Sequence, residues 1–338
     1  MSIFKGRFDG FIWASIFLWG SDRLLRLCRI LLFNRQLRGT RATATYNPNS
    51  DMIRLTIPYS TSMYQPKPGT YYYLHVVNNI RFWESHPFTV ASTTTRYHDS
   101  RTIQQSDRDI PTSTDEVSLL LRGEPRTSSA VFCGEGLEKP QAAMTFLLRP
   151  YDSFTGRLRD MAAATWPLPV SLRVLVDGPY GHMQSFDRFD HLLFIVGGSG
   201  IVVPLSYLEY FSNCIPRPKS VRIVWAAREF EFAAEVIRGE FFESLDGGKL
   251  SLDVYITKDE RCIRTSESSN WPKEVRVLSD RPDVRDEVED ATRRSEGERL
   301  AVVACGPAKM ADDARRAVVD LLASGQSRIK YFEEAFRW

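Results

Sequence analysis

The sequence lacks most of the features that mark specialised protein classes. Its five cysteines are scattered without a CxxC pair, which excludes a disulfide scaffold or a zinc ribbon and favours a reducing compartment. Lys plus Arg (44) barely exceed Asp plus Glu (42), so the basic excess expected of a nucleic-acid binder is missing. No internal repeat is visible, and the apolar runs are too few for a multi-span membrane protein. What remains is a chain of 338 residues, enough for two ordinary domains.

The most apolar segment lies near the N-terminus. Residues 10–21 form a run of 12, which as a helix spans about 18 Å against a hydrocarbon core of about 30 Å. Arg23, Arg26 and Arg29 follow between leucines, and a basic cluster directly after an apolar helix is typical of the cytoplasmic end of a membrane span. We therefore expect a membrane-proximal helix over residues 1–36 that forms the end of a last transmembrane span. An amphipathic helix packed on the protein itself is the alternative.

Residues 37–182 have the pattern of an antiparallel β-barrel. Short alternating runs are separated by Pro, Gly and Asn turns, with no long helix between them. The expected strands are residues 41–46, 52–58, 70–77, 87–92, 142–150 and 171–179. The polar stretch between Tyr97 and Gln141 is interpreted mostly as a long loop.

Residues 183–338 have a different pattern, in which strands alternate with helices. Such alternation predicts βα units and a doubly wound, Rossmann-like parallel sheet. The expected strands are residues 191–198, 220–227, 250–258 and 299–307, and the expected helices are residues 198–211, 233–245 and 308–323. The highly charged stretch from Asp259 to Glu298 is expected to be a flexible insertion.

Two short motifs lie at ends of the predicted parallel strands. One motif comprises Gly197, Gly198, Ser199 and Gly200. Glycines between a strand and a helix let backbone N–H groups approach a pyrophosphate, although an ordinary strand-to-helix turn has the same composition. The other motif comprises Cys305, Gly306 and Pro307. Ligands of open α/β sheets bind at the carboxyl ends of strands, so Cys305 either faces a ligand or is a small buried hydrophobe.

The barrel region holds two further motifs. The first comprises His86, Pro87, Phe88 and Thr89. Pro87 fixes the backbone and Thr89 offers a hydroxyl that can donate and accept, while His86 alone could be a structural turn residue. The second motif, residues 177–181, includes Tyr180 and Gly181 and by itself indicates only a rigid turn where the barrel gives way to the α/β region.

These motifs and the aromatic C-terminus (residues 331–338) occur in an order that resembles one family. The sequence HPFT, DGPYG, GGSG, WAAR, CGP and the FEEAF ending is similar to the dehydrogenase half of the ferric-chelate reductase and NADPH oxidase family, which has the ferredoxin–NADP reductase fold. The resemblance runs from about Trp13 to Trp338, and the helix from Trp19 to Arg26 is most similar to fungal metalloreductases.

The resemblance implies roles for individual residues. The HPFT motif would hold FAD with Thr89 near flavin N5, and a second flavin motif would include Arg149, Thr155 and Leu158, with Ser153 where the family usually has Gly. Residues 197–200 would bind the NADPH pyrophosphate. Tyr180, Gly181, Gly306 and Pro307 are further expected cofactor-binding residues.

The resemblance also implies roles for three residues at the flavin–nicotinamide contact and at the 2′-phosphate of the nucleotide. Cys305 would approach the nicotinamide, and Phe336 would cover the flavin until nicotinamide displaces it. Together with Thr89 these are the expected catalytic residues, and no metal site is expected. Arg228, at the end of the strand SVRIVWAA, would read the 2′-phosphate of NADPH, for which a guanidinium fork is well suited; a solvated charge at the strand end is the alternative.

The resemblance implies an FAD-containing NADPH dehydrogenase that passes electrons to haem or a ferric chelate. The family's membrane half binds haem through paired histidines, but none of the five histidines lies in a candidate span, so haem is expected only on a membrane half absent from this chain. The chain is thus expected to be N-terminally truncated relative to the family and bound to the plasma membrane, with its domains facing the cytosol and a possible haem-bearing partner. The alternatives are a superoxide-forming NADPH oxidase half and a non-catalytic remnant.

Overall fold

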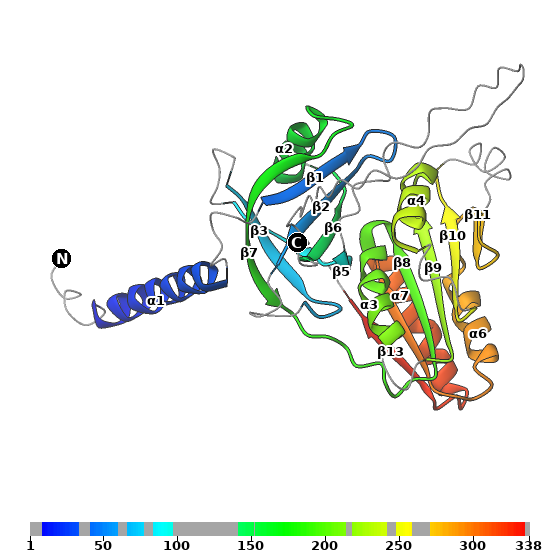
Figure 1. The fold of residues 1–338 in the computed structure, drawn as a ribbon. Helices are drawn as coiled ribbons and strands as arrows, with labels where there is room; N and C mark the ends of the chain where they lie inside the picture. Colours follow the sequence, from blue (N-terminus) through cyan, green and yellow to red (C-terminus); the bar gives the residue numbers. More distant parts are fainter. Residues whose placement is uncertain are drawn as a thin grey trace, which may run out of the picture.

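The fold consists of two β-sheets in sequence, with a separate N-terminal helix (Figure 1). It is seen in a computed structural model, which describes residues 9–33, 41–59, 66–77, 84–96, 141–151, 153–213, 218–241, 248–258 and 271–334. The predicted polar insertion after Tyr97 lies outside the described residues, up to residue 140. The predicted barrel followed by a parallel α/β domain is confirmed.

Helix α1 (Asp9–Phe33) confirms the predicted N-terminal helix. It projects away from both sheets, and its apolar side chains are exposed; Phe11 and Phe17, for example, are each 73% exposed (Figure 1). In the described part of the chain, no helix combines the length and the apolar character that a membrane crossing requires. The helix contacts the first sheet through strand β7.

The first sheet is antiparallel and has the strand order β4-β3-β7-β1-β2-β6-β5. Its strands are β1 (Arg41–Asn47), β2 (Met52–Pro58), β3 (Tyr71–Val76), β4 (His86–Thr89), β5 (Ser92–Arg96), β6 (Gln141–Leu148) and β7 (Val170–Tyr180). Only Val90 and Ala91 separate β4 from β5, yet these strands form the two edges of the sheet, so the sheet must curl until its edges meet. The single strand expected over residues 87–92 is therefore wrong: it is two strands.

A helix that the sequence pattern did not indicate closes the barrel. Helix α2 (Ser153–Ala163) buries Phe154, Leu158 and Ala162 against the inward-facing residues of the strands. These three side chains lie about one helical turn apart, so they share one face. The expectation of a barrel region without a long helix is wrong here, because most residues between Phe154, Leu158 and Ala162 are polar or glycine and hide the apolar face.

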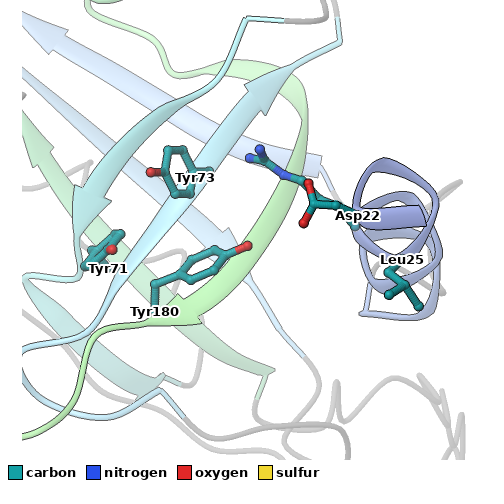
Figure 2. Close-up of a pocket in the computed structure, with 6 residues that line it drawn as sticks. Asp22, Leu25, Tyr71, Tyr73 and Tyr180 are labelled. Carbon is teal, nitrogen blue, oxygen red and sulfur yellow. The ribbon is translucent and has the colours of Figure 1, made fainter. Parts of the chain in front are cut away.

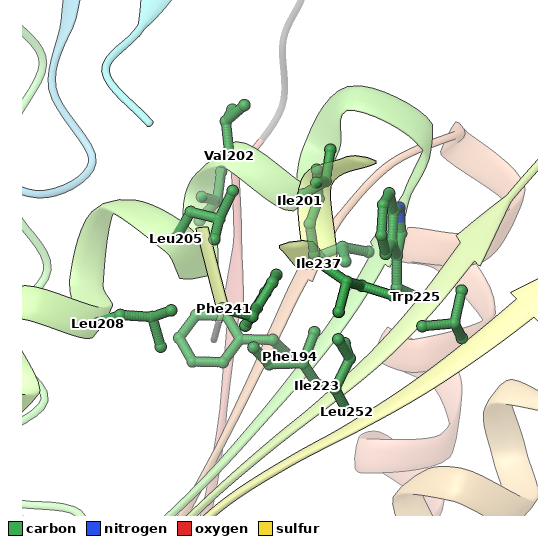
Figure 3. Packing of buried hydrophobic residues seen from close by; sticks show 14 of the residues in the cluster. Phe194, Ile201, Val202, Leu205, Leu208, Ile223, Trp225, Ile237, Phe241 and Leu252 are labelled. Carbon is green, nitrogen blue, oxygen red and sulfur yellow. The ribbon is translucent and has the colours of Figure 1, made fainter. Parts of the chain in front are cut away.

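The second sheet is parallel and has the strand order β11-β10-β9-β8-β12-β13. Its strands are β8 (His191–Gly197), β9 (Ser220–Ala227), β10 (Leu250–Ile256), β11 (Val275–Ser279), β12 (Leu300–Cys305) and β13 (Ile329–Glu333). The helical segments are η1 (Gly198–Ile201), α3 (Val202–Asn213), α4 (Phe230–Val236), the π-helical η2 (Ile237–Phe241), α6 (Val284–Arg294) and α7 (Ala308–Ala323). Helices α3 and α4 cover one face of this sheet, and α6 and α7 cover the other. Figure 3 shows Leu205 and Phe194 in the hydrophobic core on the first face.

The flexible insertion expected over residues 259–298 is wrong for residues 271–298, which form β11 and α6. Residues 259–270 lie outside the described residues. Helix α6 has a polar composition, but Val284, Val288 and Ala291 recur at helical spacing and are buried. Asp283 caps the helix by accepting hydrogen bonds from the backbone N–H groups of the first turn.

A buried ion network fixes α6 to the sheet. Asp253 on β10 is 1% exposed and accepts hydrogen bonds from Arg222 and Arg276, and Arg222 also pairs with Glu287 and Asp290 on α6. Burial pushes the pKa of Asp253 upward, but the hydrogen bonds from the two arginines outweigh burial and hold the pKa below its usual value. The charged residues of this region therefore stabilise the fold.

Replacing Asp253 by Asn should destabilise the fold by about 3 kcal/mol at neutral pH, because Arg222 would keep its burial but lose a charged partner. Urea unfolding measures this loss. The effect should be complete above about pH 5 and should shrink as the pH falls through the lowered pKa, because the carboxylate stabilises only while it is ionised. The control is Asp320→Asn, which removes an exposed ion pair with Arg285 and should change stability by less than about 0.5 kcal/mol. Equal losses in both variants would contradict the network.

Candidate functional site

Three of the predicted motifs lie along one edge of the parallel sheet. Strands β8, β9 and β12 are neighbours, and their register places Val196 opposite both Trp225 and Cys305. The turns that follow these strands therefore lie side by side. This edge, formed by the carboxyl ends of the strands, is where ligands bind in open α/β sheets.

Two of these turns pack against each other without space for a side chain. A Cβ atom added to Gly200 would lie 2.4 Å from the carbonyl oxygen of Cys305. One added to Gly197 would lie 2.7 Å from the ring of Pro307, and one added to Gly306 would lie 3.0 Å from the backbone N of Gly197. These three glycines are thus required by the contact between the turns.

Gly198 differs from the other glycines. Its φ is +55°, a left-handed conformation that favours glycine, and a Cβ atom there would meet nothing within 4 Å. Its carbonyl accepts a hydrogen bond of 2.9 Å from Nε1 of Trp225. The turn is thus held on one side by Trp225 and is open on the side where a Cβ atom would lie. The exposed Ser199 follows, and the N–H groups of η1 and α3 begin here. A small open turn at the start of a helix fits a phosphate group.

Cys305 lies beneath this turn and is 1% exposed. Burial, together with the nearby Glu334, raises the pKa of its thiol to about 12, so the thiol is neutral at physiological pH. It lies at the predicted place, at the end of β12, but as a buried side chain of the core.

Glu334 is a residue that the sequence motifs did not single out. Its N–H donates to the carbonyl of Ala304, which brings it next to Cys305. Burial raises the pKa of its carboxyl group, while the nearby His182 opposes the shift. Glu334 thus places a partly buried carboxyl group at the ligand-binding edge.

Arg228 directly follows β9 and is exposed at the same edge. The next residue, Glu229, binds Arg149 at 2.6 Å and lies 3.6 Å from Lys258, and these partners hold the pKa of Glu229 below its usual value despite its partial burial. Arg149, expected at the flavin, therefore contacts the α/β domain.

The HPFT motif forms β4, whose side chains alternate between two faces. His86 and Phe88 point toward α2, where both rings lie against Phe154, with ring centroids 4.9 and 6.0 Å away. Both remain partly exposed, so Phe88 offers a free ring surface to a flat ligand. Thr89 points to the other face and is 8% exposed.

The second predicted flavin motif lies at the start of α2, beside Phe88. Ser153 has a φ of +48°, which explains why glycine suits this position better. Thr155 accepts a hydrogen bond from the N–H of Tyr151, and Leu158 is buried in the barrel. The N-terminus of α2 and the ring of Phe88 together fit the phosphate and ring parts of a flavin nucleotide.

Tyr180 and Gly181, at the end of β7, lie on the side facing α1. There a pocket of about 470 Å³ separates Tyr71, Tyr73 and Tyr180 from Asp22, Leu25 and Arg26 of the helix (Figure 2). Asp177 lies behind it, buried, and accepts hydrogen bonds from Nε of Arg26 (2.9 Å) and the hydroxyl of Tyr180 (3.0 Å). α1 is thus attached to the strand that leads into the second domain.

Phe336, expected over the flavin, lies outside the described residues. Of the aromatic C-terminus, Tyr331 and Phe332 belong to β13, a strand the sequence pattern did not indicate. Phe332 packs edge-on against Phe186 and Phe189, with ring centroids 5.3 and 5.7 Å away. This part of the terminus is therefore structural.

The geometry defines a two-domain fold in which a barrel with a flavin-compatible surface precedes a nucleotide-binding α/β domain. Residues 37–122 match the family described as "FAD-binding domain", and residues 189–319 match the "Ferric reductase NAD binding domain". The chain belongs to the ferric reductase family and corresponds to its flavin- and nicotinamide-nucleotide-binding half.

The relatives agree with this assignment. "Ferric reductase transmembrane component 6" of Saccharomyces cerevisiae is 25% identical over 360 residues, covering 100% of this chain and 43% of the relative. Component 4 of the same yeast is also 25% identical, covering 98% and 45%. The chain thus spans less than half the length of these relatives. Among solved structures, the CS–b5R domains of human Ncb5or (NAD+ form) share the fold, with a TM-score of 0.51 at 14% identity over 86% of this chain and 68% of that one.

Alanine at Gly198 and at Gly200 should have different effects. Gly200→Ala should destabilise the protein by about 2 kcal/mol whether or not a nucleotide is present, because its methyl group would enter the backbone of Cys305. Gly198→Ala should cost only about 1 kcal/mol, from backbone strain, but should weaken the binding of a nicotinamide nucleotide at the open turn. Thermal unfolding and calorimetric titration measure the two quantities. Unchanged nucleotide affinity in Gly198→Ala would remove this turn from the site.

Proposed function

We propose that this chain takes electrons from NADPH through FAD and passes them to a ferric chelate, directly or through a haem-bearing partner in the membrane. The observation that carries the proposal is the convergence of the nucleotide turns with the HPFT end of the barrel. Ala91, two residues after Thr89, packs into the core of the α/β domain, and α3, which begins at the nucleotide turn, contacts β5. A flavin on β4 and a nicotinamide at the sheet edge would therefore share one seam.

The chain's own residues supply binding and orientation. Phe88 offers a stacking surface, and the N-terminus of α2 and the turn at Gly198 offer N–H groups to phosphates. When bound, a flavin accepts a hydride from a reduced nicotinamide and releases electrons singly, which is the chemistry that one-electron reduction of Fe(III) requires.

Helix α1 is the part of the chain proposed to contact the membrane. Its apolar side chains are exposed along residues 11–19, and its basic residues follow at the end attached to the barrel. The curated relatives are named as transmembrane components of ferric reductases. We propose that α1 lies against a membrane, with both domains on the cytosolic side, where NADPH is available.

Purified protein reconstituted with FAD should show bleaching of the flavin band near about 450 nm when NADPH is added without oxygen, and should then reduce a ferric chelate. Protein that takes up FAD but is not bleached by NADPH or by NADH would refute the proposed function. Protein that takes up no FAD would support the non-catalytic alternative. Superoxide formed in preference to Fe(II) would favour the oxidase alternative.

The preference for NADPH is proposed from Arg228, which is exposed where the 2′-phosphate would lie. Arg228→Ala should raise the KM for NADPH about tenfold or more, because a charged hydrogen bond contributes about 1.5–3 kcal/mol. The KM for NADH should change little. Steady-state kinetics with both nucleotides provide the measurement, and equal increases would show that Arg228 does not read the 2′-phosphate. Arg238→Ala, which removes an arginine of η2 that lies over Trp271, is the control.

A further inference from the structure

The two domains meet through a small apolar centre. Met52 on β2, Ala91 and Leu147 on β6 belong to the barrel, yet their side chains pack into the core of the α/β domain. Three side chains bury limited apolar area, and apolar contact has no direction of its own. The shared core brings the two domains together, and directional polar contacts across the seam refine their relative orientation.

A row of glutamates on the α/β domain makes these contacts. Glu229, Glu235 and Glu240 lie on or just before α4 and η2, and each is bonded to the barrel. Their barrel partners are Arg149 for Glu229, Asn47 and Ser50 for Glu235, and Arg54 for Glu240. We call these seven residues the interdomain clasp.

The contact between Arg54 and Glu240 is the most enclosed. The Glu240 side chain is only 7% exposed, and its charge is compensated by the Arg54 guanidinium. That guanidinium lies against the backbone of η2, since a Cβ atom added to Gly239 would lie 2.4 Å from it. The π-helical turn η2 brings Gly239 and Glu240 to this point, and such turns are frequent at functional positions.

The clasp lies away from the chain connection between the domains. In Figure 1 the segment from β7 to β8 runs along the lower side of the molecule, whereas α4 lies at the upper side, near β2 and β6. Near the connection, Gly69 donates to Ser206, and Gln184 donates to the hydroxyl of Tyr207. The domains are therefore in contact on both sides of the seam, at the chain connection and, opposite it, at the clasp.

We propose that the interdomain clasp holds the seam closed, with Arg54 and Glu240 as positioning residues for electron transfer from NADPH to FAD. This proposal rests on the function proposed above and extends it to the geometry of the seam. Arg149 adds a link between the two nucleotide sites, because its partner Glu229 directly follows Arg228 and lies near Lys258. Hydride transfer requires reacting atoms about 3–3.5 Å apart, so even a small opening would slow it.

Charge reversal tests the clasp in the full-length, FAD-loaded protein. Arg54→Glu and Glu240→Arg each place like charges together, whereas the double variant restores an ion pair. Stopped-flow absorbance at saturating NADPH gives the flavin reduction rate, and small-angle X-ray scattering gives the radius of gyration. We expect each single variant to be reduced about tenfold more slowly and to have a larger radius, and the double variant to recover most of both.

The matched control is Arg285→Glu, which reverses an arginine in an exposed pair with Glu289 on α6, outside the clasp. It should change neither the rate nor the radius. The clasp would be overturned if the single variants had the reduction rate and radius of gyration of the wild type. It would also be overturned if the double variant recovered neither quantity relative to the single variants. Slower reduction at an unchanged radius would overturn it as well. A wild type whose flavin NADPH does not reduce would instead refute the proposed function, while the scattering comparison would still test the clasp.

Discussion

The barrel and the α/β domain share part of one hydrophobic core, and the functional edge depends on this sharing. Met52, Ala91 and Leu147 leave the barrel's own cluster and join Phe194 and Trp225 in the core of the second sheet. Since Ala91 follows β4 by two residues, burying it fixes the HPFT strand next to the nucleotide turns. Two domains connected only by a linker would not hold these elements in register.

Close backbone contact is the second constraint. Gly197, Gly200 and Gly306 let the turns after β8 and β12 touch, and this leaves Gly198 as the open position. The same contact buries Cys305, whose raised pKa keeps it neutral. Glycines that suggest phosphate binding in the sequence therefore have two physical roles, and of the four glycines in these two turns only Gly198 has open space where a Cβ atom would lie.

The sequence predicted most strands along the chain and the positions of the motifs between them, because hydrophobic alternation and glycine-rich turns are local signals. The strand over residues 220–227 and the helix over residues 308–323 agree with the structure residue for residue. The sequence failed where tertiary contacts decide. Helix α6 has a cap and apolar spacing of its own, but its polar composition hid them, and its ion pairs with Arg222 come from a distant strand. Strand β13 owes its order to pairing with β12, which its own residues do not reveal.

For the candidate site, too, local patterns predicted some features and missed those that depend on distant contacts. Local pattern placed residues 197–200 and 305–307 correctly at the ends of strands. It placed residues 86–89 at the start of a longer strand, whereas they form the whole of β4. It gave no sign of Trp225 beneath Gly198, of Glu334 beside Cys305, or of Arg149 bound to Glu229, because each of these contacts joins residues distant in the sequence. Roles that depend on burial and on partners from another domain cannot be predicted from the motif alone.

The central claim is that flavin and nicotinamide meet at the seam between β4 and the carboxyl edge of the parallel sheet. An experimental structure of the protein with FAD and NADP+ bound tests this most directly. The account predicts the flavin ring against Phe88, the NADP+ pyrophosphate at Gly198, and room at the seam for nicotinamide to come within about 3.5 Å of the flavin. Density for either nucleotide away from this seam, or for the flavin between α1 and Tyr73, would contradict the account.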